Sequence, residues 1–374
     1  MERLKQKLQQ RLEEGNYRSL TVSENLTDFF SNDYLGLSRN EELKKIIEAK
    51  SNNLGWSNGA TGSRLLSGNS QYIMFLESKL ARLFQAESCL VFNSGYNANL
   101  SILSSVPQKG DTIIYDELIH ASLKDGARLS FADRYSFKHN NIADLEAKLQ
   151  KATGKVFVVA ETVYSMDGDF CPLKELTQLC EQYHAYLILD EAHSTGVFGK
   201  DGNGLICEAG LHDKVFARIY TFGKGMGVHG ACIAGSQLLI DYLVNFARPF
   251  IYTTALPYHS YASIESAFDY LKHNGTLQSR LKNIIAYFKL RFEQEINKKD
   301  ILIGSDSSIQ VLKIRGNKEA KELAAYLRSE GMDVRAILAP TVKAGEERLR
   351  ICLHVYNTEE EIDILIRKLK DKVA

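Results

Sequence analysis

The sequence lacks the features that mark several protein classes. It has no excess of either charge, because 46 Lys and Arg residues balance 46 Asp and Glu residues over 374 positions. Without a net charge or a block of basic residues, nothing attracts the chain to nucleic acid or anionic lipid over long range. No apolar run approaches the roughly 18 residues that a membrane-spanning helix needs. We therefore expect neither a nucleic-acid partner nor a membrane.

Cysteine is scarce and dispersed. The six cysteines form no C-x-x-C pair, which argues against a zinc ribbon or a disulfide framework. We expect free thiols and no metal site. The segment MERLKQKLQQRLEEG (1–15) is dense in both charge signs and lacks the apolar centre of a signal peptide. We therefore expect a cytoplasmic protein.

Short apolar runs alternate with amphipathic stretches in the first two thirds of the chain. This alternation favours an α/β fold with helices packed on a mostly parallel sheet. The strands are predicted at 90–92, 112–115, 156–161, 186–191, 218–222 and 231–236, and the intervening helices at 70–86, 142–151 and 173–184.

The pattern changes near residue 261. It predicts, in order, a long helical stretch at 261–297, strands within 301–314, a helix at 317–330, strands at 332–339 and 348–353, and a helix at 358–371. This order suggests a small α+β domain. We therefore predict an N-terminal arm (1–40), a large α/β domain (41–260) and a small C-terminal α+β domain (261–374).

One lysine stands out in TFGKGMGVHGA (221–231). Lys224 directly follows a predicted strand and is surrounded by glycines, so its amine could serve as a Schiff-base nucleophile. An ordinary exposed loop lysine is the alternative. Gly225, Gly227 and Gly230 match G-x-G-x-x-G, but a strand-like ACIAGS follows instead of a helix, so a dinucleotide site is not expected.

The segment DEAH (190–193) places an acid and an imidazole after another buried strand. No P-loop accompanies it, so an NTPase is not expected. Asp190 could instead pair with a cationic ring nitrogen, and His193 with a neighbouring oxygen. The alternative is that Asp190 caps a turn and that His193 is an incidental loop residue.

Three more strands are followed by polar candidates. NSGYNAN (93–99) reads as a turn that opens a helix, whose first N–H groups could bind phosphate or merely be capped. His120 follows the next strand, and Ser165 and Asp167 follow the one after it. Ligands of open α/β sheets bind at the carboxyl ends of the strands. Together these residues fit a phosphate, a protonated ring nitrogen, a ring face and an aldehyde, and pyridoxal 5′-phosphate carries all four.

Along nearly its whole length the sequence resembles the α-oxoamine synthases, which are fold-type-I pyridoxal-phosphate enzymes. The resemblance rests on ordered motifs: GNYRSL (15–20), FSNDYLGLS (30–38), GATGSRLLSGN (59–69), NSGYNAN, SMDGD (165–169), LDEAHSTGVFG (189–199), TFGKGMGVHGA, FARPFIYTTALP (246–257) and APTVKAGEERLR (339–350). It implies a large domain with a mostly parallel seven-stranded sheet and a small α+β domain.

The resemblance also implies roles for individual residues. Lys224 would form the Schiff base with the cofactor and Asp190 would pair with its pyridine nitrogen, while His193 would bond to the phenolic oxygen and His120 would stack on the ring. The backbone of Gly95 and Tyr96 would form the cofactor cradle, with further contacts from Ser165, Thr221 and, from a neighbouring subunit, Thr253 or Thr254.

Substrate positions are implied as well. They are Arg18, Asn32, Thr341 and Arg350, of which Arg350 would hold an amino acid carboxylate through a bidentate fork. Three further charges, Arg64, Lys343 and Arg348, are expected to be solvated surface residues.

The implied reaction is a decarboxylative condensation of L-alanine with a pimeloyl thioester, carried on CoA or on a carrier protein, in a homodimer with shared active sites. The stretches 223–231 and 246–257 favour this member of the family. Relatives that use glycine or serine share the cofactor motifs, and an aminotransferase on the same fold or a non-catalytic binding protein are further alternatives.

Overall fold

The computed structural model describes all residues except 23, 55–56, 297–300 and 374. The chain divides into two compact units. The larger unit comprises Leu35–Tyr164 and Phe170–Gln278, and the smaller one Met1–Tyr34, Ser165–Asp169 and Ser279–Ala374.

The larger unit contains a seven-stranded sheet in the order β2-β8-β7-β6-β5-β3-β4. Strand β8 is antiparallel to both β2 and β7, and the other neighbouring pairs are parallel. The strands are β2 (Ser88–Phe92), β3 (Thr112–Asp116), β4 (Asp133–Phe137), β5 (Val156–Glu161), β6 (Tyr186–Asp190), β7 (Ala217–Thr221) and β8 (Ala231–Gly235). The mostly parallel sheet predicted from the sequence is confirmed.

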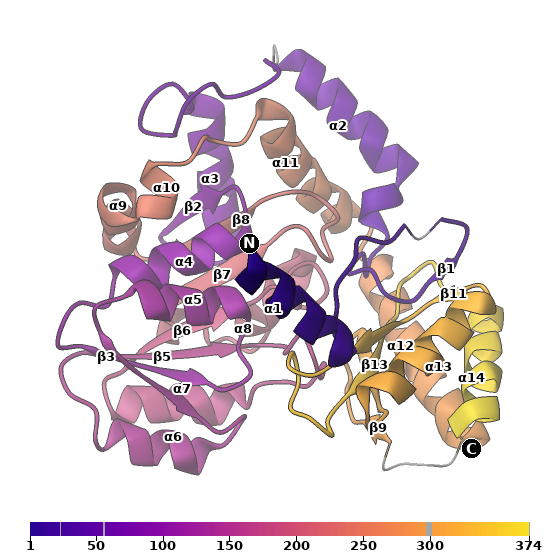
Figure 1. The fold of residues 1–374 in the computed structure, drawn as a ribbon. Helices are drawn as coiled ribbons and strands as arrows, with labels where there is room; N and C mark the ends of the chain where they lie inside the picture. The colour runs from indigo at the N-terminus through magenta and orange to yellow at the C-terminus, as the bar shows by residue number, and fades with distance from the viewer. Residues whose placement is uncertain (23, 55–56, 297–300, 374) are drawn as a thin grey trace. The chain divides into compact units, whose positions relative to one another are not determined.

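Helices cover both faces of this sheet. Figure 1 shows α4 beside α5 above the strands, and α6 beside α7 below them. The helices are α2 (Glu41–Asn53), α3 (Gln71–Leu83), α4 (Gly95–Ser105), α5 (Ala121–Leu129), α6 (Ile142–Leu149), α7 (Leu173–Gln182), α8 (Gly204–Glu208), α9 (Gln237–Phe246), α10 (Arg248–Ile251) and α11 (Tyr258–His273), with 3₁₀ turns at Leu37–Arg39, Lys200–Gly202 and His212–Lys214. Side chains of Asn40, Ser70, Ser94, Asn141 and Ser236 accept a backbone N–H and so cap five of them.

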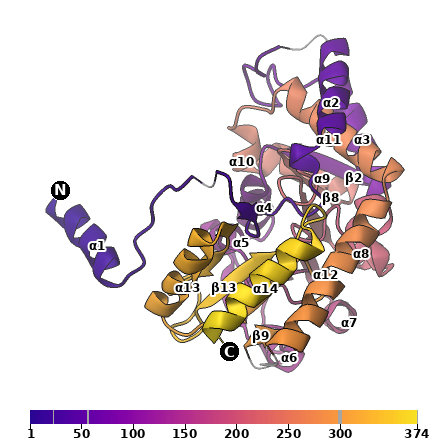
Figure 2. The same ribbon diagram turned by 90° about the vertical axis from the view of Figure 1, so that its right-hand side faces the viewer.

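The smaller unit has its own antiparallel sheet, in the order β12-β13-β10-β9, and a separate parallel pair of β1 with β11. Figure 2 shows α13 and α14 side by side next to β13. The elements are α1 (Glu2–Glu13), β1 (Thr27–Asp28), β9 (Leu302–Ile303), β10 (Ile309–Lys313), α13 (Asn317–Ser329), β11 (Met332–Asp333), β12 (Arg335–Ile337), β13 (Arg348–Cys352) and α14 (Glu359–Val373).

Three features differ from the sequence-based expectation. The pattern of apolar runs did not predict β4, an edge strand with four exposed residues in DRYSF. The stretch 261–297 forms two helices, α11 and α12 (Thr276–Glu295), because α11 ends at His273 and Gly275 lies in the break; residue 297 lies outside the described residues. The larger unit extends to Gln278, since a boundary at 260 would cut α11.

Among the described residues, no helix is both long and apolar enough to span a membrane.

Candidate active site

The candidate site lies at one edge of the larger sheet. Strands β3, β5, β6 and β7 are mutually parallel, so their carboxyl ends meet there. Glu161, Asp190 and Thr221 are the last residues of three of these strands. The structure thus places Lys224, His193 and His120 close together at this edge, whereas Ser165 and Asp167 belong to the smaller unit.

Lys224 and His193 contact each other at this edge. The Lys224 Nζ atom lies 3.0 Å from His193 Nε2. The surrounding loop is closely packed, because a Cβ on Gly225 would lie 2.7 Å from the Thr195 carbonyl oxygen, whereas a Cβ on Gly223 would meet nothing closer than 3.7 Å. The backbone after Lys224 is therefore tightly packed, whereas the backbone before it has open space beside it.

Asp190 is buried, with 3% of its surface exposed. Its Oδ1 accepts the backbone N–H of Ala192 at 2.8 Å, and its Oδ2 accepts a hydrogen bond from Asn99 Nδ2 at 2.8 Å. Two donors thus fix the orientation of a carboxyl group that the apolar core would otherwise disfavour.

His120 caps the N-terminus of α5. Its Nδ1 lies 2.7 Å from Ser122 Oγ and accepts the Ser122 N–H at 3.2 Å. Desolvation and then the charge of Lys224 lower the pKa of His120. The residue as a whole is exposed.

Glu161 is a buried acid that the sequence analysis did not select. It accepts the backbone N–H of His120 and is the sheet neighbour of Asp190. Burial, together with the charge of Asp190, raises the pKa of Glu161 to about 8, although Lys224 opposes the shift. Glu161 is thus expected to be protonated at neutral pH.

This shift predicts a pH dependence of stability. Between about pH 4.5 and pH 8 the unfolded chain has lost the Glu161 proton and the folded chain retains it, so the free energy of unfolding falls as pH rises. Glu161→Gln should make the fall of the unfolding free energy with pH shallower, by the equivalent of about one proton per molecule. Denaturant unfolding at several pH values measures this slope. The exposed Glu175→Gln is the control, and an unchanged slope in Glu161→Gln would contradict the assignment.

The start of α4 offers an anion-binding cradle. Ser94 caps the helix, since its Oγ accepts the Asn97 N–H at 3.2 Å, and the helix begins at Gly95 and Tyr96. A Cβ on Gly95 would lie 2.4 Å from Thr221 Cγ2, so a larger residue there would displace the Thr221 side chain. Thr221 Oγ1 is buried without a partner among the described residues. A phosphate at this helix start could accept hydrogen bonds from the first backbone N–H groups of α4 and from Thr221 Oγ1.

Thr253 is linked to the segment that leads into this cradle. Its Oγ1 accepts a hydrogen bond from Asn93 Nδ2 at 3.0 Å. Thr253 is half-buried and Thr254 is exposed. Their predicted role toward a neighbouring subunit stays a prediction.

The smaller unit brings Arg350, Asn32 and Ser165 together. Arg350 is buried on β13; its Nε donates to the Ser165 carbonyl oxygen at 2.8 Å and its Nη2 to Asn32 Oδ1 at 3.0 Å. Arg18 Nη2 likewise donates to Thr341 Oγ1 at 3.4 Å. The predicted substrate residues therefore form two contacting groups within this unit.

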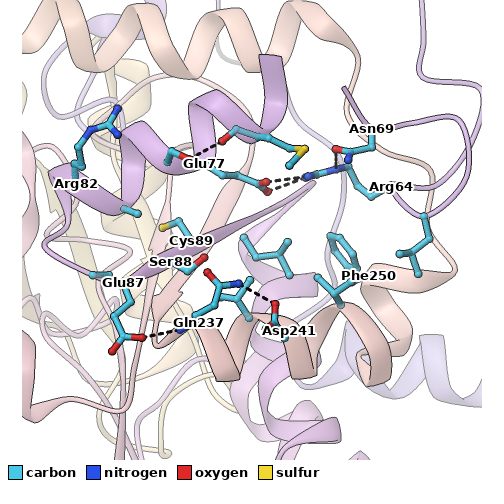
Figure 3. Close-up of a pocket in the computed structure, with 18 residues that line it drawn as sticks. Arg64, Asn69, Glu77, Arg82, Glu87, Ser88, Cys89, Gln237, Asp241 and Phe250 are labelled. Carbon is cyan, nitrogen blue, oxygen red and sulfur yellow. Dashed lines mark hydrogen bonds and ion pairs between the residues drawn. The ribbon is translucent and has the colours of Figure 1, made fainter. Parts of the chain in front are cut away.

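The expectation that Arg64 and Arg348 are solvated is wrong. Arg64 forms a bidentate pair with Glu77 at 2.8 and 2.9 Å, beside a cavity of about 500 Å³ (Figure 3). Only 9% of its side chain is exposed. Arg348 pairs with Asp167 and has 7% of its side chain exposed. Ion pairing allows these cations to be buried. Lys343 is exposed, as predicted.

Sequence reasoning also missed Asn99 and Ser122, which connect Asp190 to His120. One signal was present: Asn99 is the last residue of the motif at 93–99, and Ser122 follows His120 by two positions. The groups that pyridoxal 5′-phosphate would need are present in the larger unit: the helix start at Gly95, the carboxylate of Asp190, the exposed residue His120 and the amine of Lys224. The donor set therefore fits that cofactor.

Comparison with known proteins supports this assignment. The sequence signature of the family described as aminotransferase class I and II matches residues 24–369. An 8-amino-7-oxononanoate synthase from Emericella nidulans is 40% identical, covering 98% of this chain and 94% of the relative. The solved 8-amino-7-oxononanoate synthase of Francisella tularensis is 29% identical with a TM-score of 0.78, covering 94% of this chain and 98% of that one.

A serine palmitoyltransferase from Sphingomonas wittichii also shares the fold, with a TM-score of 0.88 and 26% identity, covering 99% of this chain and 96% of that one. The fold is therefore shared by enzymes with different names. The sequence identity is higher to the 8-amino-7-oxononanoate synthase, at 40%, than to the serine palmitoyltransferase, at 26%. This chain belongs to the aminotransferase class I and II family, within the 8-amino-7-oxononanoate synthases.

Proposed function

We propose that this chain condenses L-alanine with a pimeloyl thioester to give 8-amino-7-oxononanoate, with release of the thiol and of CO₂, using pyridoxal 5′-phosphate. Support comes from the 40% identity to a named synthase over nearly the whole chain. The observation that carries the chemistry is the convergence of Lys224, His193, Asp190 and His120 at one sheet edge.

The residues at this edge would hold the cofactor in complementary ways. Lys224 would bind it covalently through Nζ, the α4 start at Gly95 would bind its phosphate, and Asp190 would keep a proton on its ring nitrogen. When bound, pyridoxal 5′-phosphate supplies a cationic ring that accepts the electron pair released from the amino acid Cα.

Once the amine of alanine has replaced Nζ in the bond to the cofactor, the freed amine of Lys224 would act as the base that takes the proton from alanine Cα. Its contact with His193 at 3.0 Å holds Nζ in one direction, and fixed orientation is a large part of such catalysis. The resulting carbon nucleophile would attack the thioester carbonyl, the thiol would leave, and the β-keto acid so formed would lose CO₂.

Arg350 would bind the alanine carboxylate. Arg350→Lys should therefore raise the KM for alanine about tenfold or more with a smaller change in kcat, because lysine cannot reproduce the bidentate fork. Steady-state rates at saturating acyl donor measure this effect. The exposed Arg315→Lys serves as the control, and an unchanged KM in Arg350→Lys would contradict the role.

Mass spectrometry of products tests the reaction as a whole. Alanine, glycine and serine would each be incubated with pimeloyl-, acetyl- and palmitoyl-CoA. The proposal predicts 8-amino-7-oxononanoate from alanine and pimeloyl-CoA as the main product. A palmitoyl product from serine would instead support the function of the Sphingomonas relative, and pyridoxamine phosphate without CO₂ would indicate an aminotransferase.

We also propose a homodimer in which Thr253 or Thr254 contacts the cofactor phosphate of the neighbouring subunit. The support is the family resemblance and the contact of Thr253 with Asn93, which precedes the cradle.

A further inference from the structure

A continuous set of buried hydrogen bonds joins Asp190 to His120. Asn99 Nδ2 lies 2.8 Å from Asp190 Oδ2 and 2.9 Å from Ser122 Oγ, and Ser122 Oγ lies 2.7 Å from His120 Nδ1. Asn99 is 2% exposed and Ser122 is fully buried. We call these two residues the Asn99–Ser122 bridge, and the mechanism above gives neither of them a role.

The chemistry of the bridge fixes the direction of each hydrogen bond. The carboxylate of Asp190 can only accept, so the amide nitrogen of Asn99 must face it, and the second amide hydrogen points to Ser122 Oγ. The hydroxyl proton of Ser122 is then left to donate to His120 Nδ1. The opposite amide orientation would set the Asn99 oxygen against a carboxylate oxygen.

A second donor reaches the same ring nitrogen. The backbone N–H of Ser122 points to His120 Nδ1 at 3.2 Å, so Nδ1 accepts from both groups and the ring proton resides on Nε2. Around the ring, Lys224 and Lys124 disfavour the imidazolium, Asp190 and Asp125 favour it, and Glu161 bonds the backbone. Desolvation outweighs the carboxylates and lowers the pKa of His120.

We propose that the Asn99–Ser122 bridge is a positioning element that orients the carboxylate of Asp190 and holds His120 neutral with its proton on Nε2. The buried amide of Asn99 would then help to orient both the acid that faces the cofactor and the imidazole that stacks on it. His120 would present an N–H donor, and not a cation, to the bound ligand. The inference rests on the proposed roles of Asp190 and His120.

Nitrogen NMR of the full-length holoenzyme, labelled at histidine, tests the proposal. A His120→Asn spectrum assigns the His120 signals. The wild type should show Nδ1 without a proton and Nε2 with one at neutral pH. In Ser122→Ala the ring should titrate about half a unit to one unit higher, because the neutral form loses a donor. Ser105→Ala, which removes a hydroxyl that donates to the Ser101 carbonyl oxygen, should leave the midpoint unchanged.

Cofactor affinity tests whether the bridge acts as a unit. We expect Asn99→Leu to weaken pyridoxal-phosphate binding about tenfold and Ser122→Ala about threefold, with the double variant close to tenfold instead of thirtyfold. Fully multiplicative losses, a proton on Nδ1 in the wild type, or an unmoved midpoint in Ser122→Ala would each overturn the proposal.

The NMR result does not depend on which product the enzyme makes. If Asn99→Leu does not fold, the Ser122→Ala spectrum alone decides. A chain that fails to condense alanine but shows the expected His120 signals would contradict the proposed function and leave the bridge intact.

Discussion

Replacing Lys224 with alanine is expected to reduce turnover at least about a thousandfold while leaving the cofactor able to bind. The variant removes both the covalent attachment and the base at Cα, and base catalysis by a positioned side chain alone contributes about 10²- to 10⁴-fold. The phosphate cradle at Gly95 and the carboxylate of Asp190 remain, so non-covalent binding should persist.

Two measurements test this prediction. Product formation measures turnover, and the visible absorbance that arises from the lysine-bound cofactor should be absent from the spectrum. The exposed Lys109→Ala is a matched control that should retain both. Substantial turnover in Lys224→Ala would show that another residue carries the chemistry.

Asp190→Asn is expected to slow proton removal from alanine by about 10²- to 10³-fold, or about 3 to 4 kcal/mol. A neutral amide no longer holds a proton on the cofactor ring nitrogen. The substitution also leaves one acceptor for two donors, because Ala192 N–H and Asn99 Nδ2 each bond one oxygen of the native carboxylate. A donor would then face a donor in a buried site.

The rate of exchange of the alanine α-proton in D₂O, followed by NMR, measures this loss without the later steps. Asp133→Asn is the matched control, since Asp133 is an exposed residue at the start of the edge strand β4. Exchange at the wild-type rate in Asp190→Asn would exclude the proposed pairing with the ring nitrogen.

The central strands could be predicted from sequence because they are buried on both faces. Runs such as VFVVA and YLIL have almost no polar residue, and parallel strands covered on both faces require this composition. Strand β4 could not be found in the same way, since an edge strand with an exposed face needs no apolar run. Its pairing with β3 is a tertiary property.

The candidate site was predictable where a motif follows a strand, as for Lys224 and His193. Glu161 was part of a predicted strand, yet its closeness to Asp190 depends on the pairing of β5 with β6. Arg64 and Arg348 appeared available because sequence alone does not reveal their partners, Glu77 and Asp167. The sequence alone does not show which residue will lie beside a buried charge and neutralise it, because that depends on the tertiary fold.

The central claim is that this sheet edge removes the α-proton of alanine with the help of pyridoxal 5′-phosphate. The most direct test is incubation of the cofactor-loaded wild type with L-alanine in D₂O, without any acyl donor, while NMR follows the Cα proton. The expected result is exchange of that proton with no release of CO₂. An enzyme that binds the cofactor and alanine but leaves the α-proton in place would contradict it.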